Sequence, residues 1–412
     1  MSVLLSRRAV LQAAIETTYD TAVAVGVNDG FLVNNPMFTI KPNVLERNFV
    51  RNDLSQMPFI IGRKLASMEF ETELRGNGKQ NSGLPADAAL ITRLFQACGY
   101  ALTSHATPSI KGPYQVGDAP VSVSWAVSAV SATNTDVIAY YVTVDTPGPS
   151  GTAKVTITSD TTGEGSASAM VTSGTMINLG TKGATITPTW AGSLTVGMQW
   201  VVWLMPQGQS LDPISDLFSS ATLVMHKDGV KHTMPGSFGT FEITAQAGNF
   251  ATVKWNFTGT YVAPVDEANP APIFETTLPS QVELARLRMN NFTAIVEKFT
   301  FNQANDIQIR PDVSSSDGYI GTRIVARKPV GGINPEADNV ANNDFWGQMS
   351  AAQRMPFQMR VGHTVGNTIW VTAPNTQYTG LTYTDRNGIL AYDAGLHFGR
   401  TLGNDEISFF MC

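Results

Sequence analysis

The residue types that most often carry out chemistry in proteins are sparse and scattered in this sequence. The five histidines are far apart, and none has the spacing of a metal-binding motif such as HExxH. They are His105, His226, His232, His363 and His397. Neither a GxSxG nucleophile elbow nor a GxxxxGK[ST] phosphate-binding loop occurs. We therefore expect a protein that is not an enzyme and that uses no metal or cofactor.

Three glutamates, by contrast, share one face of a predicted strand. Glu69, Glu71 and Glu73 alternate with mostly apolar residues from Met68 to Leu74, and strand side chains alternate between two faces. The row along this strand contains no lysine or arginine, whereas a surface selected for solubility mixes both signs. One interpretation is an ordinary solvated sheet face. The other is a face that repels a polyanion.

The elements that must position these side chains are mainly β-strands. Alternating apolar residues occur at 253–257 and 390–398, and Asp228-Gly229 and Asn387-Gly388 are hairpin signals. His226 and His232 flank the first signal, so we interpret them as a pair beside a turn. Helical periodicity is limited to residues 85–98 and, more weakly, 343–353.

Two windows of the sequence, residues 50–65 and 309–324, are similar without a gap. Five positions are identical: Arg51/Arg310, Asp53/Asp312, Ser55/Ser314, Ile61/Ile320 and Gly62/Gly321. An apolar strand precedes each window, and a helix signal and hairpin signals follow it. The spacing far exceeds the roughly 20–50 residues of solenoid repeats, so it predicts two copies of a whole domain. The alternative is a chance similarity between two strand–loop–strand units.

Residues 106–211 interrupt the first copy and hold only eight charged residues. Short strands rich in Thr, Ser and Val, separated by Gly- and Pro-containing turns, predict a separate β-sandwich. Insertion at a surface loop is the simplest origin, because such loops tolerate insertions. The expected division is a first copy at 1–105 and 212–278, the insertion at 106–211, and a second copy at 279–412.

The bulk composition excludes several classes of protein. The net charge of −6 argues against a basic face that grips nucleic acid. Two cysteines imply no disulfide framework. No apolar run reaches the 18–20 residues of a membrane span, so we expect no membrane partner.

Several short motifs, in this order, resemble tail tube (major tail) proteins of long-tailed, non-contractile phages (siphophages). They are SRRAVL at 6–11, IETTY at 15–19, NP at 35–36, ERNFVR at 46–51, GRK at 62–64, EFETEL at 69–74, LFQACG at 94–99, DG at 228–229, GSFG at 236–239, FTGTY at 257–261, RKP at 327–329 and GNDE at 403–406. The resemblance covers about 1–104 and 212–412. The insertion instead resembles the immunoglobulin-like decorations of tail proteins.

The resemblance implies a mainly β fold with two tandem tail-tube domains, each a barrel-forming β-sandwich with one short helix, plus the inserted sandwich. Strands of neighbouring subunits would close a barrel around a channel for DNA. An acidic wall lets DNA slide, whereas a basic wall would bind it. The lumen-facing candidates are therefore Glu69, Glu71, Glu73 and, in the second copy, Glu336. The second copy's strand near 333–336 has far less charge, so the bore would be unevenly lined.

Tube rings of this family contain six tube domains, so two domains per chain predict a trimeric ring with pseudo-sixfold symmetry. A ring of six chains is the alternative. The loops around Arg51/Asp53 and Arg310/Asp312 are candidates for contacts between subunits or rings, and an intramolecular salt bridge or turn is the alternative for them. Further implied partners are the tape-measure protein and DNA in the lumen, and the terminator and distal tail proteins at the ends. The expected location is the virion tail, assembled in the host cytoplasm.

Two other functions stay open at the level of sequence. The first alternative is another tail part, such as a terminator or distal tail protein, which would not polymerise alone. A carbohydrate-binding, adhesin-like protein is the second alternative, in which Trp190, Trp200 and Trp203 would form a sugar-stacking surface. Alternation within the strand places at least one of Trp200 and Trp203 in a core instead.

Overall fold

The computed structural model describes residues 4–5, 7–79, 88–130, 132–283, 285–290, 292–315 and 317–412. Strands dominate, and the described residues form two short helices, α1 (Thr92–Ala97) and α2 (Phe345–Ser350). The predicted mainly β class is confirmed. Both helices lie within predicted helical segments, although residues 85–87, where the first was expected to begin, lie outside the described residues. Gly99, with φ of 89°, follows the end of α1, and the Asp344 side chain caps α2 by accepting the Gly347 N–H.

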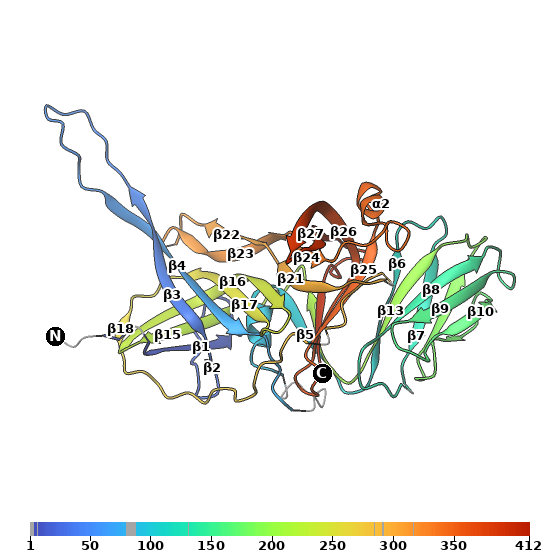
Figure 1. Ribbon diagram of the computed structural model, residues 1–412. Coiled ribbons are helices and arrows are strands. Elements are labelled where there is room, and N and C mark those ends of the chain that lie inside the picture. Colours follow the sequence, from blue (N-terminus) through green and yellow to red (C-terminus); the bar gives the residue numbers. More distant parts are fainter. Residues whose placement is uncertain are drawn as a thin grey trace.

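Eight antiparallel strands form one continuous sheet, which we call the long sheet (Figure 1). Its order is β3 (Asn34–Leu45), β4 (Ile60–Glu73), β17 (Thr252–Thr260), β16 (Val230–Gln246), β21 (Val296–Asn302), β24 (Val330–Pro335), β27 (Ile389–Phe398) and β26 (Ile369–Arg386). Both predicted turns are present, since Asp228-Gly229 joins β15 (Ala221–Lys227) to β16, and Asn387-Gly388 joins β26 to β27.

The long sheet repeats one four-strand pattern. In each half, a pair of strands (β3–β4 or β21–β24) lies beside a later hairpin (β17–β16 or β27–β26). The registers match as well. A bulge at Pro235 separates the pairs Ala221–Ser237 and Leu223–Met234, and a bulge at Pro374 separates the equivalent pairs of β25 (Met355–Val361) with β26. This matched pattern supports the interpretation of two copies; we call the halves the first and second units, and their exact boundaries stay a prediction.

A second layer of strands covers the apolar side of the long sheet. In the first unit it contains β1 (Ala9–Ile15), β2 (Gly30–Phe31), β15 and β18 (Val265–Asp266). The second unit is covered by β5 (Tyr100–His105), β14 (Gly208–Pro213), β28 (Ser408–Met411), β25, β19 (Arg288–Met289) and β20 (Phe292–Thr293).

The two units share one hydrophobic core. Phe95 of α1 has ring centroids 4.8 Å from Phe241 and 5.0 Å from Trp255 in the first unit. Phe241 in turn lies 5.7 Å from Phe301 of the second unit, and all four side chains are buried. Because aromatic groups of this size dominate core energetics, the shared core holds the two units together.

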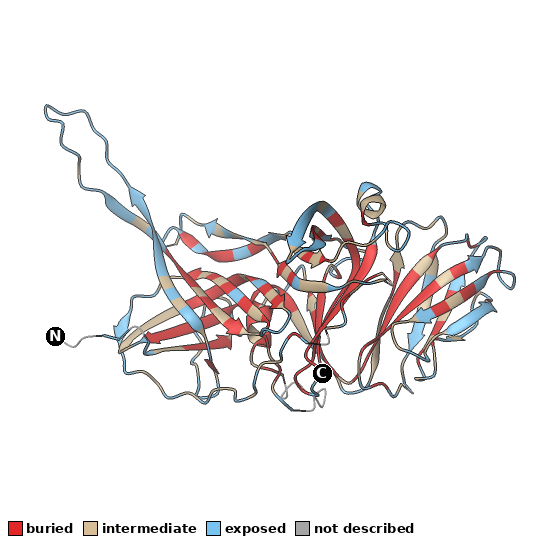
Figure 2. Cartoon of the chain, in the orientation of Figure 1, coloured by how far each residue is buried: buried red, intermediate tan, exposed pale blue. Residues whose placement is uncertain are grey.

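Each unit carries a long hairpin arm. The first arm continues β3 and β4 beyond the sheet, over residues 41–64, and projects into solvent (Figures 1 and 2). The second arm is formed by β22 (Asn305–Pro311) and β23 (Tyr319–Arg327), which continue β21 and β24. Unlike the first arm, it lies against the first unit, where Tyr319 donates a hydrogen bond to the Lys64 carbonyl at 2.6 Å.

The insertion forms two sheets around a core of its own. One sheet has the order β10 (Ser166–Met170), β9 (Lys154–Ser159), β8 (Ile138–Thr146), β13 (Gln199–Met205) and β6 (Ser109–Val116). The other has the order β11 (Ile177–Asn178), β12 (Thr185–Trp190) and β7 (Val123–Ser128). In Figure 1 the insertion lies at the end of the molecule opposite the first arm.

Polar contacts hold the insertion against the second unit, although the insertion interrupts the sequence of the first unit. The Asp136 carboxylate lies 2.8 Å from an Arg360 guanidinium nitrogen and accepts the Trp370 indole N–H at 2.8 Å. The Trp203 indole N–H donates to the Gln358 side chain at 2.8 Å. Because the Trp370 and Trp203 indole N–H groups and the Asp136 carboxylate are paired across the junction, these contacts hold the insertion against the second unit.

We expect Asp136→Ala to loosen this junction. The change removes a charge-assisted hydrogen bond and the acceptor of a buried indole, so it should cost about 1–3 kcal/mol of unfolding free energy. Limited proteolysis should then cleave faster between β5 and β6. Asp145→Ala, at an exposed site of the insertion, is the matched control, and equal cleavage rates in both variants would contradict the assignment.

Candidate functional site

The face of the long sheet that points away from the core is its polar face. Along β4, Met68, Phe70, Thr72 and Leu74 are buried, whereas Glu69, Glu71 and Glu73 are only partly buried. The alternation predicted from the sequence is therefore present, and the three carboxylates share one side of the sheet. Figure 2 shows this alternation of buried and more exposed positions along the strands.

The neighbouring strand β17 adds a positive charge beside this row of glutamates. Lys254 of β17 pairs directly with Glu71, and Asn256 lies opposite Glu69 and donates to it at 3.4 Å. Arg75 lies 3.6 Å from Glu73. The face around the glutamates thus mixes both signs. The β4 pattern could not indicate this, because Lys254 lies more than 180 residues away from Glu71 in the sequence.

The polar face continues across the six strands from β4 to β27. One row of directly paired residues passes through Glu71, Lys254, Glu242, Asn302, Val330 and His397. The next row passes through Glu73, Thr252, Thr244, Thr300, Gly332 and Gly395. This face carries more carboxylates than lysines. The carboxylates are Glu69, Glu71, Glu73, Glu242 and Asp393, and the lysines are Lys254 and Lys298. The surface is mostly hydrophilic and weakly acidic, although Met37 and Val330 are exposed on it.

Glu336 occupies the place in the second unit that Glu73 occupies in the first. The matched pairs are Phe70 with Trp255 in the first unit and Ile333 with Ala394 in the second. Glu73 lies three residues after Phe70, and Glu336 lies three residues after Ile333. Its carboxylate, however, lies 3.4 Å from Arg386, which also lies 3.4 Å from Glu297. Arg386 therefore offsets part of the charge of Glu336, and the strand positions equivalent to Glu69 and Glu71 hold Gly332 and Asn334.

The four contact candidates lie in the two arms. In the first arm Asp53 accepts the Ser55 N–H at 2.9 Å, and in the second Asp312 accepts the Ser314 N–H at 2.9 Å. Arg51 also pairs with Asp53 at 2.9 Å in an exposed loop, whereas Arg310 lies within β22. The arms share a turn but differ in the ion pair. A role for these residues in contacts between copies stays a prediction.

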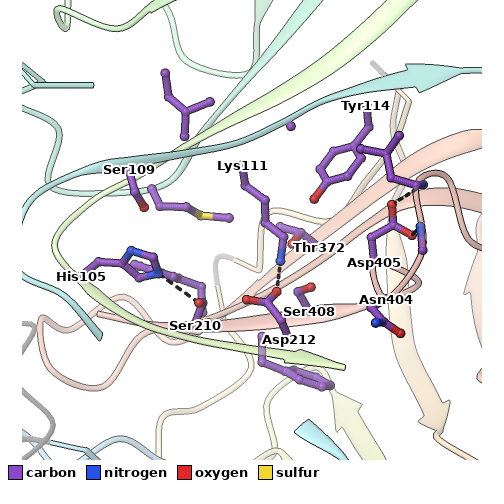
Figure 3. Close-up of a pocket in the computed structure, with 17 residues that line it drawn as sticks. His105, Ser109, Lys111, Tyr114, Ser210, Asp212, Thr372, Asn404, Asp405 and Ser408 are labelled. Carbon is purple, nitrogen blue, oxygen red and sulfur yellow. Dashed lines mark hydrogen bonds and ion pairs between the residues drawn. The ribbon is translucent and has the colours of Figure 1, made fainter. Parts of the chain in front are cut away.

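One pocket contains residue types that recur in catalytic sites, and the sequence analysis did not identify it (Figure 3). It lies where the chain enters and leaves the insertion and has a volume of about 350 Å³. The His105 imidazole nitrogen Nε2 lies 3.0 Å from the Ser210 hydroxyl, and burial lowers the pKa of His105. Lys111 pairs with Asp212 in the same pocket.

These four residues are not arranged as a hydrolase triad. A third group would have to orient the imidazole, and the nearby Asp212 carboxylate is bound to Lys111 instead. Burial alone would raise the pKa of Asp212, but the Lys111 charge and hydrogen bonds outweigh burial and lower it. We interpret the cluster as a structural contact that joins β6 to β14 where the insertion begins and ends.

The sugar-stacking alternative is contradicted by burial. The exposed fractions of Trp190, Trp200 and Trp203 are 8%, 3% and 0%, so none offers a ring face to a ligand. His226 and His232 do lie on adjacent strands beside the Asp228-Gly229 turn, where His226 contacts Glu267 at 3.0 Å. Within the described ranges no group of three acidic, His or Cys side chains could hold a metal ion. The helices in the same ranges are too short to cross a membrane.

We expect Lys254→Glu to destabilise the polar face. The new carboxylate would stand between Glu71 and Glu242, and like charges across strands cost roughly 0.5–1 kcal/mol per pair. The melting temperature at low salt should fall by about 2–5 °C, and high salt should restore part of the loss. Lys254→Gln is the control for loss of the lysine, and a similar melting temperature in both variants would refute the charge argument.

Comparison with known proteins agrees with the resemblance that the motifs suggest. Residues 6–380 match the family model described as "Phage tail tube protein". None of the curated proteins compared with this chain matches it. The family match covers the first unit, the insertion and the second unit as far as β26, which is most of the chain, so the chain belongs to the phage tail tube protein family.

Proposed function

We propose that this protein forms trimeric, pseudo-hexameric rings that stack into the tail tube of a siphophage, with a central channel for genome ejection. The observation that carries the proposal is the open long sheet, which has two unpaired edges and a hydrophilic face. Among the described residues, β3 pairs only with β4, and β26 beyond Tyr378 pairs only with β27. Exposed sheet edges attract further strands, and closure of a barrel between subunits removes them.

The strand number favours three chains over fewer. One chain supplies eight strands, which in a closed barrel would enclose little more than side chains. Three chains supply 24 strands, and at about 4.8 Å spacing and about 40° tilt the barrel would be roughly 48 Å across at the backbone. Such a channel is wider than a DNA duplex. Because each chain holds two units, the ring would have pseudo-sixfold symmetry; a ring of six chains is the alternative.

In this ring the polar face would line the channel, with Glu69, Glu71 and Glu73 in the lumen. Carboxylates repel the DNA backbone, and the neighbouring lysines weaken the repulsion without making the surface basic. Glu336 would also face the lumen, but its pairing with Arg386 makes the second unit's wall less acidic than the first unit's. The rings would surround the tape-measure protein and then DNA, would meet terminator and distal tail proteins at the ends, and would assemble in the host cytoplasm.

Electron microscopy of the purified protein tests this function. We expect hollow tubes of constant width, or free rings, with threefold symmetry in end-on views. A terminator or distal tail protein would instead give discrete particles that do not elongate. Monomers under all assembly conditions, or rings with sixfold symmetry and six chains, would contradict the trimeric tube.

We expect the triple variant Glu69→Lys, Glu71→Lys and Glu73→Lys to assemble into tails but to slow genome delivery. The six-unit change in charge per chain would convert part of the wall into a DNA-binding surface. The measurement is the rate of DNA release from virions that carry the variant. The triple Gln variant removes charge without adding a basic surface, and normal release from the Lys variant would argue against a lumen position.

A further inference from the structure

We propose the register of the contact between neighbouring copies: the free edge of β26 pairs antiparallel with the free edge of β3 in the next copy, with Thr382 opposite Thr39. This inference rests on the proposed ring and specifies its interface. The partner is a second copy of this chain, because the chain already contains a contact of the same kind between its own two units.

The template is the junction of β16 with β21. Glu242 pairs with Asn302 on the polar face, and the Asn302 amide donates to the Glu242 carboxylate at 2.6 Å. On the core side of the same strands, Ile243 pairs with Phe301, and both side chains are buried. The last strand of one unit is thereby joined to the first strand of the following unit.

The position of Thr382 follows from the equivalence of β26 with β16. Ser237 and Thr376 stand at the same place relative to the proline bulge in their strands. β26 contains one extra residue near Thr379. Beyond it, the pair Leu381–Ala394 is equivalent to the pair Phe241–Trp255. The next residues therefore correspond, so that Thr382 takes the place of Glu242, and Tyr383 takes the place of Ile243.

The position of Thr39 follows from the equivalence of β3 with β21. Ser67 lies three residues before Phe70, and Val330 lies three residues before Ile333, the matched positions of β4 and β24. Ser67 pairs with Thr39, and Val330 pairs with Asn302. Thr39 therefore takes the place of Asn302, and Phe38 takes the place of Phe301.

The exposed side chains at the two edges agree with this register. Thr39 and Thr382 are exposed on the polar face. On the other face, Tyr383 is 54% exposed although it contacts Tyr392 at 5.1 Å, and Phe38 is half-buried. Pairing Tyr383 with Phe38 of the next copy would extend the apolar layer as Ile243 and Phe301 do. The edges lie at opposite ends of the long sheet (Figure 1), so each needs a different copy.

The arms give independent support for a second copy as the partner. The second arm crosses the β16–β21 junction and binds the first unit, where the Tyr19 hydroxyl accepts the Thr322 N–H at 2.6 Å and donates to the Thr322 carbonyl at 2.9 Å. Gly321 makes room for this contact, since a Cβ there would lie 2.0 Å from the Tyr19 oxygen.

Beyond its base, where the Lys64 carbonyl accepts the Tyr319 hydroxyl, the first arm has no comparable contact among the described residues, yet it is apolar. Val44, Leu45 and Ile61 are 46%, 47% and 50% exposed, and Phe49 is 65% exposed at its tip. A monomer rarely exposes so many large apolar side chains on one projecting hairpin. By the same geometry, the first arm would cross the β26–β3 junction and lie on the second unit of the neighbouring copy.

Disulfide trapping tests the register. In the double variant Thr39→Cys and Thr382→Cys, paired Cα atoms would lie about 4.5–5.5 Å apart, within the range of a disulfide. Mild oxidation of assembled protein should give dimers and trimers on denaturing gels without reductant, and no larger species. The native thiols do not compete, because Cys98 is buried and burial raises the pKa of Cys412 to about 12.

Matched variants separate the register from the assembly. Each single cysteine variant should stay monomeric on the gel, and Thr39→Cys with Thr384→Cys, two residues away on the same face, should cross-link at least tenfold more slowly. Intact tubes in which the shifted pair reacts faster, or neither pair reacts, would overturn the register and leave the tube function standing. If unmodified protein and variants form no rings or tubes, the proposed function itself fails. Cross-linked species of up to six chains on the gel would support the register but contradict the trimer.

Discussion

The structure depends on one constraint: the backbone hydrogen-bonding groups at the two edges of the long sheet need partners. Within the chain, the edges of β16 and β21 pair with each other, because both units belong to one polypeptide. The outer edges at β3 and β26 have no such partner among the described residues. A sheet with one polar and one buried face cannot leave long edges free without inviting association. In the proposed ring, closure would turn this liability into a specific interface.

Joining two units in one chain removes half of the interfaces that separate chains would have to form and lets the units differ. Three carboxylates line β4, whereas the matched strand carries Gly332, Asn334 and a paired Glu336. The second unit instead holds the insertion, through Asp136 and Arg360. A ring built from identical units would repeat every feature six times. In the proposed trimer, acidic wall and insertion each recur three times, on alternate units.

Local patterns predicted what depends on local structure. The two hairpin turns, both helices and the sides of β4 follow from residue spacing, and the structure contains each of them. The sequence could not indicate that Lys254 pairs with Glu71, that the three tryptophans are all buried, or that the insertion rests on the second unit. Those features depend on which distant strands become neighbours. The window that suggested duplication matched a shared Asp–Ser turn, but the arms that contain it lie in different surroundings.

The most direct test of the account is a cryo-EM map of the assembled protein at a resolution that separates β-strands. The account predicts a closed barrel of 24 strands from three chains, with β26 of each chain beside β3 of the next and Glu69, Glu71 and Glu73 facing the bore. A map in which the long sheets stay open, or in which those glutamates face outward, would contradict it.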